Sequence, residues 1–180
     1  MGTNLIKFEF DDNIYYITKN GIAYEHFFLL SEDEATKVAN AYFAATPYNN
    51  LDEDALLEYV RMSCRMGVFN RTLEAFTYGL SKYSRYSFGK DAIATITSGY
   101  RNMGQPRKAI DFALVYVDDM SLRSVPLLTS LAAAYCDIGN LESARRYCNI
   151  AYALQGGGTG YKTELSLVYA RIKKMENERL

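Results

Sequence analysis

Histidine and cysteine are common metal ligands and catalytic nucleophiles, and this chain of 180 residues contains four of them. His26 is the single histidine, so neither a histidine metal cluster nor a repeated His-carboxylate arrangement can form. Cys64, Cys136 and Cys148 stand singly inside predicted helices and not in a Cys-x-x-Cys pair. That spacing favours buried reduced thiols over a zinc site or a disulfide framework. We therefore expect no bound metal.

The segment 156–160 is rich in glycine, as phosphate-binding loops are. It lacks their Lys-Ser/Thr ending and follows no predicted strand, so we interpret it as a flexible link. The acidic pairs Asp11-Asp12 and Asp118-Asp119 fit turns or helix ends. We expect no catalytic residue, no cofactor and no enzyme activity.

Cations and aromatic rings alternate in one connecting segment, at Lys82, Tyr83, Arg85 and Tyr86. Such interleaving suits stacking on single-stranded nucleic acid, and tyrosine and arginine are also favoured at protein contacts. A third interpretation is structural, with Tyr83 and Phe88 packed between helical repeats and with Lys82 and Arg85 solvated. The sequence leaves these three alternatives open.

The composition indicates one ordinary folded protein. Hydrophobic residues make up 49% and charged residues 23%, which excludes a disordered chain. The net charge of −1 provides no overall field that would attract nucleic acid or an anionic membrane. Neither a signal peptide nor an apolar run of about 20 residues is recognisable, so we expect a soluble, cytoplasmic protein.

The first thirty residues predict a three-stranded antiparallel meander. Residues 6–10 alternate apolar with charged side chains, 14–18 are β-branched or aromatic, and Asn20-Gly21 is a hairpin signal before a third strand at 22–29. Because a small sheet is marginal in water, its apolar face must be covered, and the adjacent helices are the expected cover.

Helical patterns fill the rest of the chain. Ser31 and Glu34 form a capping box for a helix that ends at Pro47. The later helices are predicted in pairs: 52–66 with 70–83, 89–103 with 106–119, and 125–138 with 140–155, followed by a last helix at 161–178. Gly67, Gly104 and Gly139 close the first member of each pair in the left-handed conformation that ends helices.

Three segments repeat one pattern of anchors. The sets are Tyr59, Ser63, Gly67, Thr72, Phe76, Gly79; Ile96, Tyr100, Gly104, Ala109, Ala113, Tyr116; and Leu131, Tyr135, Gly139, Ala144, Cys148, Ala151. The turn glycines are separated by 37 and 35 positions, close to the roughly 34-residue period of helical-hairpin solenoids. Solenoids bury their core by stacking neighbours, and their ends need atypical caps. We expect the meander with its helix, and the last helix, to be those caps.

Residues 52–156 resemble tetratricopeptide repeats. The best copy is Leu128-x2-Leu131-Ala132-x2-Tyr135, Gly139, Ala144-x3-Cys148-x2-Ala151. The chain departs from the family pattern at Val60, Thr97 and Ala132, where that family favours glycine, and it lacks the terminal proline. The resemblance implies a mainly α fold, an α-solenoid of helical hairpins. The small N-terminal antiparallel β-meander predicted above precedes it.

The resemblance further implies a concave groove, lined by the first helix of each pair, that receives a peptide or helix of another protein. The groove residues that follow from it are Arg61, Arg65, Ser98, Arg101, Asn102, Thr129 and Asp137. The arginines would form a cationic, hydrogen-bonding strip suited to an acidic peptide. The alternative is that they are solvated or paired with Asp54, Asp91 and Asp137.

We therefore expect residues 1–50 to form a capping meander plus helix and 51–180 to form the repeats with a C-terminal helix, in one folding unit. The expected function is a non-catalytic adaptor, chaperone or regulatory subunit that binds another protein. A self-assembling structural protein, and after it a single-stranded nucleic-acid binder, are the alternatives.

Overall fold

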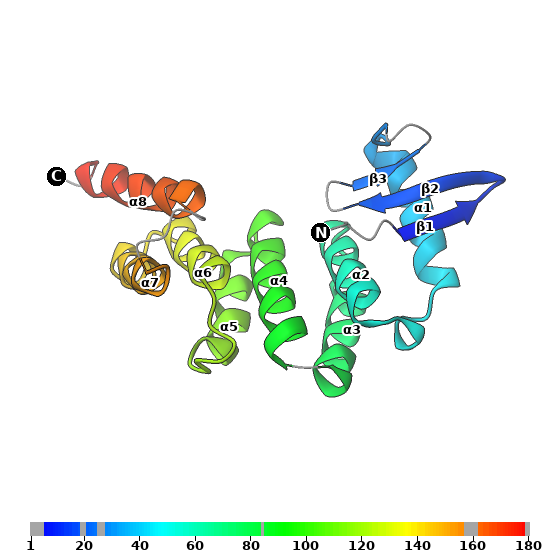
Figure 1. The fold of residues 1–180 in the computed structure, drawn as a ribbon. Coiled ribbons are helices and arrows are strands. Elements are labelled where there is room, and N and C mark those ends of the chain that lie inside the picture. The colour runs from blue at the N-terminus through cyan, green and yellow to red at the C-terminus, as the bar shows by residue number, and fades with distance from the viewer. Residues whose placement is uncertain (1–5, 19–20, 25–27, 84, 157–161, 179–180) are drawn as a thin grey trace. The chain divides into compact units, whose positions relative to one another are not determined.

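The computed structural model describes residues 6–18, 21–24, 28–83, 85–156 and 162–178, without the side chains at positions 85, 86, 162 and 163. The protein is mainly α. Its described residues contain eight α-helices packed in consecutive pairs, preceded by a three-stranded antiparallel sheet (Figure 1). The chain divides into two compact units, Met1–Tyr83 and Ser84–Leu180. Our division at residue 50 stays a prediction.

The first unit begins with the predicted meander. Its strands are β1 (Ile6–Phe10), β2 (Asn13–Thr18) and β3 (Gly21–Ala23), in the order β1-β2-β3. Phe8 pairs with Tyr15 in the first ladder, and Ile17 pairs with Ile22 in the second. Asp11 and Asp12 form the connecting turn with φ angles of 53° and 59°. Two such residues in succession define the tight turn that matches strand twist in hairpins.

The third strand is shorter than the predicted 22–29. It ends at Ala23, and Leu29 returns to form an isolated antiparallel bridge with Ala23. The amide of Tyr24 donates to the Phe28 carbonyl over 2.9 Å, and the amide of Leu30 donates to the Ile22 carbonyl over 3.0 Å. Leu29 thus lies antiparallel to Ala23, where the sequence predicted one continuous strand.

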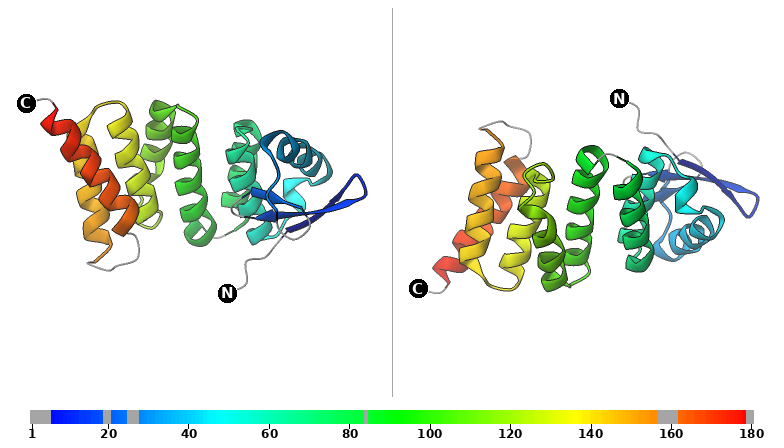
Figure 2. Two further views of the ribbon diagram at one scale, coloured as in Figure 1. Left: turned by 90° about the horizontal axis from the view of Figure 1, so that it is seen from above. Right: turned by 90° about the horizontal axis from the view of Figure 1, so that it is seen from below.

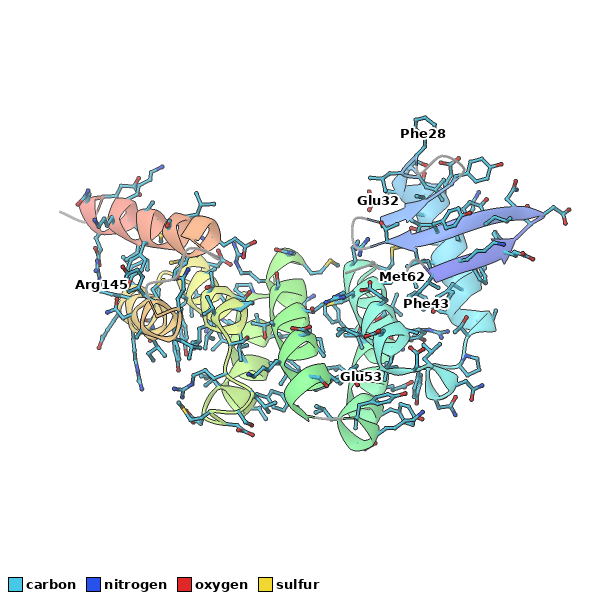
Figure 3. All side chains as sticks on the ribbon, viewed as in Figure 1. Phe28, Glu32, Phe43, Glu53, Met62 and Arg145 are labelled. Atoms are coloured by element: carbon cyan, nitrogen blue, oxygen red, sulfur yellow. The ribbon has the colours of Figure 1, made fainter. Side chains whose placement is uncertain are left out.

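The sheet is covered by α1 (Glu32–Ala45), as predicted. The ring of Phe8 meets the buried ring of Tyr42 edge-on, with 5.4 Å between centroids. Glu34 accepts a 2.7 Å hydrogen bond from the Ser31 hydroxyl at the start of α1, and this bond lowers the pKa of Glu34. Phe28 projects away from the sheet and is 72% exposed (Figure 3).

The first helical pair consists of α2 (Glu53–Arg65) and α3 (Phe69–Lys82), reached through the 3₁₀ turn η2 (Tyr48–Asn50). Asp52 caps α2 by accepting from the amide of Ala55 over 2.9 Å. Tyr59 of α2 is 1% exposed and meets Phe43 of α1 with 5.0 Å between centroids. This contact between aromatic rings joins α1 to the first helical pair.

The second unit contains the other two pairs and the last helix. Its elements are the π-helix η3 (Arg85–Gly89), α4 (Lys90–Asn102), α5 (Pro106–Val117), α6 (Val125–Asp137), α7 (Leu141–Leu154) and α8 (Lys162–Asn177). Within this unit α6 lies between α4 and α8, and α5 and α7 pack on its other side (Figure 2). The predicted helix limits agree with these elements to within two residues.

The core of the second unit combines large and small residues. Ile93, Ile96 and Leu131 are fully buried on the first helices of their pairs. Ala109 and Ala144 are fully buried on the second helices. Small side chains at these positions allow close approach, and the larger ones fill the space between helices, as dense interior packing requires.

The turn glycines have the predicted left-handed conformation. Gly67, Gly104 and Gly139 have φ angles of 72°, 70° and 75°. After Gly104, the amide of Gln105 donates over 2.9 Å to the Tyr100 carbonyl, the long bond of the Schellman motif, and the other two turns repeat it. None of the helices described combines the length and apolar character that crossing a bilayer requires.

Candidate functional site

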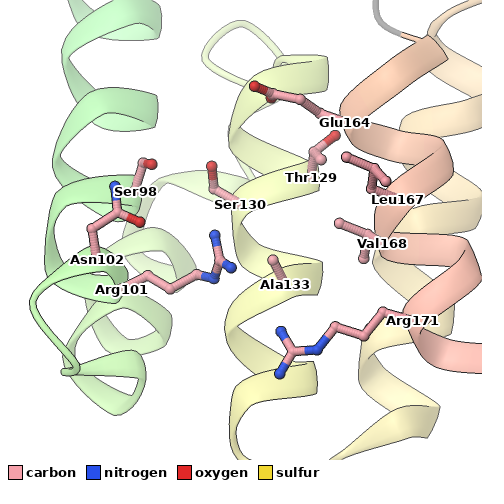
Figure 4. A pocket seen from close by; sticks show the side chains of 10 residues that line it. All are labelled: Ser98, Arg101, Asn102, Thr129, Ser130, Ala133, Glu164, Leu167, Val168 and Arg171. Carbon is pink, nitrogen blue, oxygen red and sulfur yellow. The ribbon is translucent and has the colours of Figure 1, made fainter. Parts of the chain in front are cut away.

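The candidate site is a pocket in the second unit, formed by α4, α6 and α8. These are the first helices of two successive pairs, followed by the last helix of the chain. The pocket has a volume of about 360 Å³. Its lining consists of Ser98, Arg101 and Asn102 on α4, Thr129, Ser130 and Ala133 on α6, and Glu164, Leu167, Val168 and Arg171 on α8 (Figure 4).

Asp137 holds two of the pocket's arginines together. Nε of Arg101 donates to Oδ2 of Asp137 over 2.7 Å, and Nη1 of Arg171 donates to Oδ1 over 2.5 Å. The Asp137 side chain is 23% exposed. Two guanidinium groups around one carboxylate leave a local excess of one positive charge, and each guanidinium has five N–H donors in all. This end of the pocket can therefore bind an additional acceptor.

Thr129 supplies an unsatisfied hydroxyl beside the pocket. The residue is 4% exposed, and its Oγ1 has no hydrogen-bond partner among the described residues. Buried hydroxyls are paired in most proteins, since leaving one unpaired costs about 1–3 kcal/mol. A buried group left in this state next to a cavity is a candidate for contact with a ligand.

The pocket has a second, acidic end. Glu164 lies at the opposite end of the lining from Arg101 and Arg171, as Figure 4 shows. Leu167 and Val168 lie between them on α8, and Leu167 is 65% exposed. Along α8, the side chains that line the pocket thus change from acidic to apolar and then to basic.

The structure brings together the five predicted groove residues of the second unit. Ser98, Arg101, Asn102 and Thr129 line the pocket, and Asp137 joins them through its ion pair with Arg101. For Arg101, the predicted alternative of pairing with Asp137 is therefore the observed geometry. Its charge is shared inside the protein and does not form an isolated cationic strip.

The two predicted groove residues of the first unit lie on α2. Arg61 is half-buried and pairs with Glu58 one turn earlier. Arg65 lies beside Gly21 of β3. A Cβ atom built on Gly21 would be 3.7 Å from Nη1 of Arg65. Both side chains have neighbours within the first unit, and neither is among the residues that line the pocket.

No family model matches the sequence, and no curated protein or solved structure shows significant similarity to it. The candidate site therefore has to be understood from its own residues.

The structure describes two of the four side chains predicted as a secondary contact, those of Lys82 and Tyr83. The Lys82 ammonium lies 5.2 Å from the ring centroid of Tyr78 and 5.1 Å from that of Tyr83, and hydrogen bonds to both hydroxyls raise its pKa. Tyr83 donates from its hydroxyl to the Leu51 carbonyl over 2.6 Å. The Tyr83 hydroxyl is therefore held within the first unit, and the packing of Tyr83 between repeats stays a prediction. The side chains of Arg85 and Tyr86 lie outside the described residues.

Sequence reasoning missed the contribution of α8, which supplies Glu164, Leu167, Val168 and Arg171. The sequence did contain a signal for this contribution. Leu165 and Tyr169 follow Leu131 and Tyr135 by 34 positions, and Arg171 follows Asp137 by the same number, so these residues occupy equivalent helix positions. Treating the last helix as the first member of a further pair would have identified its pocket-facing residues.

In the described part of the chain, the side chains that could bind a metal or act as a nucleophile do not cluster. Among the described residues, no group of three or more histidine, cysteine, aspartate or glutamate side chains is placed to hold a metal ion. Cys64, Cys136 and Cys148 are unbridged and buried, and burial raises the pKa of each thiol, to about 12 for Cys64 and Cys148. His26 and residues 157–160 of the predicted glycine link lie outside the described residues.

Proposed function

We propose that this protein is a non-catalytic interaction module with tetratricopeptide-like hairpins, which binds a segment of another protein. The pairing of helices, the left-handed turn glycines and the small residues at Ala109 and Ala144 support the repeat assignment. A cytoplasmic location is part of the proposal, because three unbridged thiols suit a reducing compartment.

One observation carries this function: a pocket on successive first helices whose lining is suited to recognition. It combines ion-paired arginines, an unsatisfied hydroxyl at Thr129 and exposed apolar surface at Leu167. Recognition sites typically pair apolar surface with a few placed polar groups. An adaptor, chaperone or regulatory subunit needs such a surface and no reacting group.

The test compares two exposed apolar residues of the second unit, each replaced by arginine. Leu167→Arg places a long cation in the pocket, while Val115→Arg, at a site 71% exposed on α5, leaves the pocket lining unchanged. Partners from a lysate of the source organism are captured on each full-length variant and quantified by mass spectrometry. Specific partners lost with Leu167→Arg alone support the proposal. Equal capture by both variants, or no capture by the wild type, contradicts it.

A second candidate function is self-assembly, favoured by one region of the first unit. Phe28 and Leu29 are adjacent and are 72% and 59% exposed. They follow β3, and β1 at the other side of the sheet pairs only with β2 among the described residues. Exposed strand edges and adjacent apolar residues promote association between copies. Sedimentation at several concentrations tests this function, and a monomer throughout would exclude it.

A further inference from the structure

The pocket in the second unit is polarised, and its polarity is set along one helix. Glu164 and Arg171 are seven residues apart on α8, which separates them by two turns or about 10 Å along the axis. At the Arg171 end, Arg101 adds a second guanidinium and Asp137 offsets one of the two charges. The pocket thus has a negative end and a positive end, with Leu167 and Val168 between them.

The spacing of the charged ends suits a short extended segment. A chain in the extended polyproline II conformation rises about 3.1 Å per residue with three residues per turn, so side chains three residues apart lie on one face about 9 Å apart. This separation is close to that of Glu164 and Arg171 along α8. The pocket volume of about 360 Å³ is within the range of sites that hold small ligands.

Thr129 provides the hydrogen-bonding group of the site. Its Oγ1 is without a partner among the described residues, although the side chain projects from α6 toward α8 in Figure 4. Thr129 lines the pocket, and a rotation of about 120° about its Cα–Cβ bond moves the hydroxyl to the position that the methyl group holds. A peptide backbone offers both a donor and an acceptor, and a hydroxyl can pair with either.

Resting on the function proposed above, we propose that this pocket binds an extended partner segment that carries opposite charges three residues apart. The basic residue of the segment lies at Glu164, and the acidic residue lies at Arg101 and Arg171. A backbone group of the segment bonds to the Thr129 hydroxyl, and a small apolar side chain contacts Leu167. The partner is thus selected for a basic and an acidic residue together, and a uniformly acidic segment is disfavoured by Glu164.

The experiment uses arrays of acetylated, amidated hexapeptides that are bound by the fluorescently labelled full chain. Zwitterionic peptides contain lysine and aspartate three residues apart, in both orders, with randomised residues between them. The controls are peptides with two aspartates, with two lysines, or with asparagine at both positions. The proposal expects the zwitterionic sets to bind at least about threefold more tightly than every control. Equal or stronger binding of the doubly acidic set would overturn it.

Two variants locate the binding in the pocket. Glu164→Lys makes both ends of the pocket positive, so the preference should change from zwitterionic to doubly acidic peptides. Thr129→Val removes the hydroxyl and keeps the shape, so affinity should fall about tenfold, the loss of one buried hydrogen bond to ligand. Thr129→Ser keeps the hydroxyl and should retain binding. An unchanged preference in Glu164→Lys, or unchanged affinity in Thr129→Val, would overturn the assignment.

The failures of the two proposals are distinguishable. If partner capture depends on Leu167 while no charge pattern is preferred on the arrays, the interaction function stands and the charge selectivity is wrong. If no partner is captured and no hexapeptide binds, both are wrong. The thermal midpoint of each variant, measured alongside, ensures that a loss of affinity is not a loss of folding.

Discussion

Arg101 on α4 and Asp137 on α6 form an ion pair with 2.7 Å between Nε and Oδ2, which joins the first helices of two successive pairs. The same carboxylate also accepts from Arg171 on α8. A single side chain therefore connects the three helices that line the pocket. This arrangement positions the arginines and limits how much positive charge they present.

Replacing Asp137 by asparagine should weaken the contacts among α4, α6 and α8. The pairs are partly exposed, so we expect a decrease of about 1 kcal/mol in the free energy of unfolding, with a smaller difference from wild type at high salt. Urea denaturation at low and high salt measures both effects. Glu178→Gln serves as the control, because its pair with Lys174 is well exposed on both side chains and should contribute almost nothing. Equal losses in the two variants would contradict this role for Asp137.

Replacement by valine should lower the free energy of unfolding at one buried threonine, Thr72, and not at another, Thr129. Thr72 donates from its hydroxyl over 2.8 Å to Ser63 Oγ inside the first pair, and both residues are fully buried. Thr72→Val should therefore lower the free energy of unfolding by about 1 kcal/mol. Thr129→Val removes a hydroxyl that has no partner among the described residues, so stability should stay equal or rise. Chemical denaturation of the two variants provides the comparison, and a large loss in Thr129→Val would reveal a structural partner.

The helices were predictable because their ends are encoded locally. Asp52 caps α2 as its side chain type suggests, and Gly104 ends α4 in a conformation that other residues avoid. The third strand was predicted too long because residues 22–29 contain no glycine, proline or asparagine that would mark the end of β3 at Ala23. Local chemistry indicates where helices stop better than where apolar strands do.

Part of the candidate site was predictable because the sequence repeat places equivalent residues on successive helices. Repeat spacing identified Ser98, Arg101 and Thr129, because equivalent positions on successive first helices face the same way. It left open whether Arg101 would be solvated or paired, because the answer depends on the distance between α4 and α6. Arg171 was missed because the last helix was interpreted only as a cap, although it also lines the pocket.

The turn glycine Gly104 should be replaceable only at a conformational cost. Its φ of 70° disfavours a side chain, yet a Cβ there would meet no atom within 4 Å, so crowding plays no part. Gly104→Ala should lower the free energy of unfolding by about 1 kcal/mol. Gly104→Asn should lower it less, because asparagine tolerates the left-handed region better. Thermal or urea unfolding should rank wild type above Gly104→Asn and Gly104→Ala last, and equal stabilities would contradict the conformational argument.

The three cysteines should be inert in the folded protein at pH 8. Burial raises the pKa of Cys64 and Cys148 to about 12 and also raises that of Cys136. Because the thiolate is the reactive form, a disulfide exchange reagent such as Ellman's reagent should modify none of the three quickly in the native state. All three should react after unfolding in guanidinium. Rapid native reaction of a thiol would show that its surroundings are open to water.

The same pKa values predict how stability depends on pH in the alkaline range. In the unfolded chain the thiols lose their protons near the ordinary value of 9.0, while folded Cys64 and Cys148 keep theirs until about 12. Above pH 9 the unfolded state therefore binds fewer protons, and the free energy of unfolding should fall between about pH 9 and pH 12. Cys148→Ala should reduce this slope, even though it removes packing and lowers stability at pH 7. A slope equal to that of wild type, measured by urea denaturation at several pH values, would assign the alkaline loss to other groups.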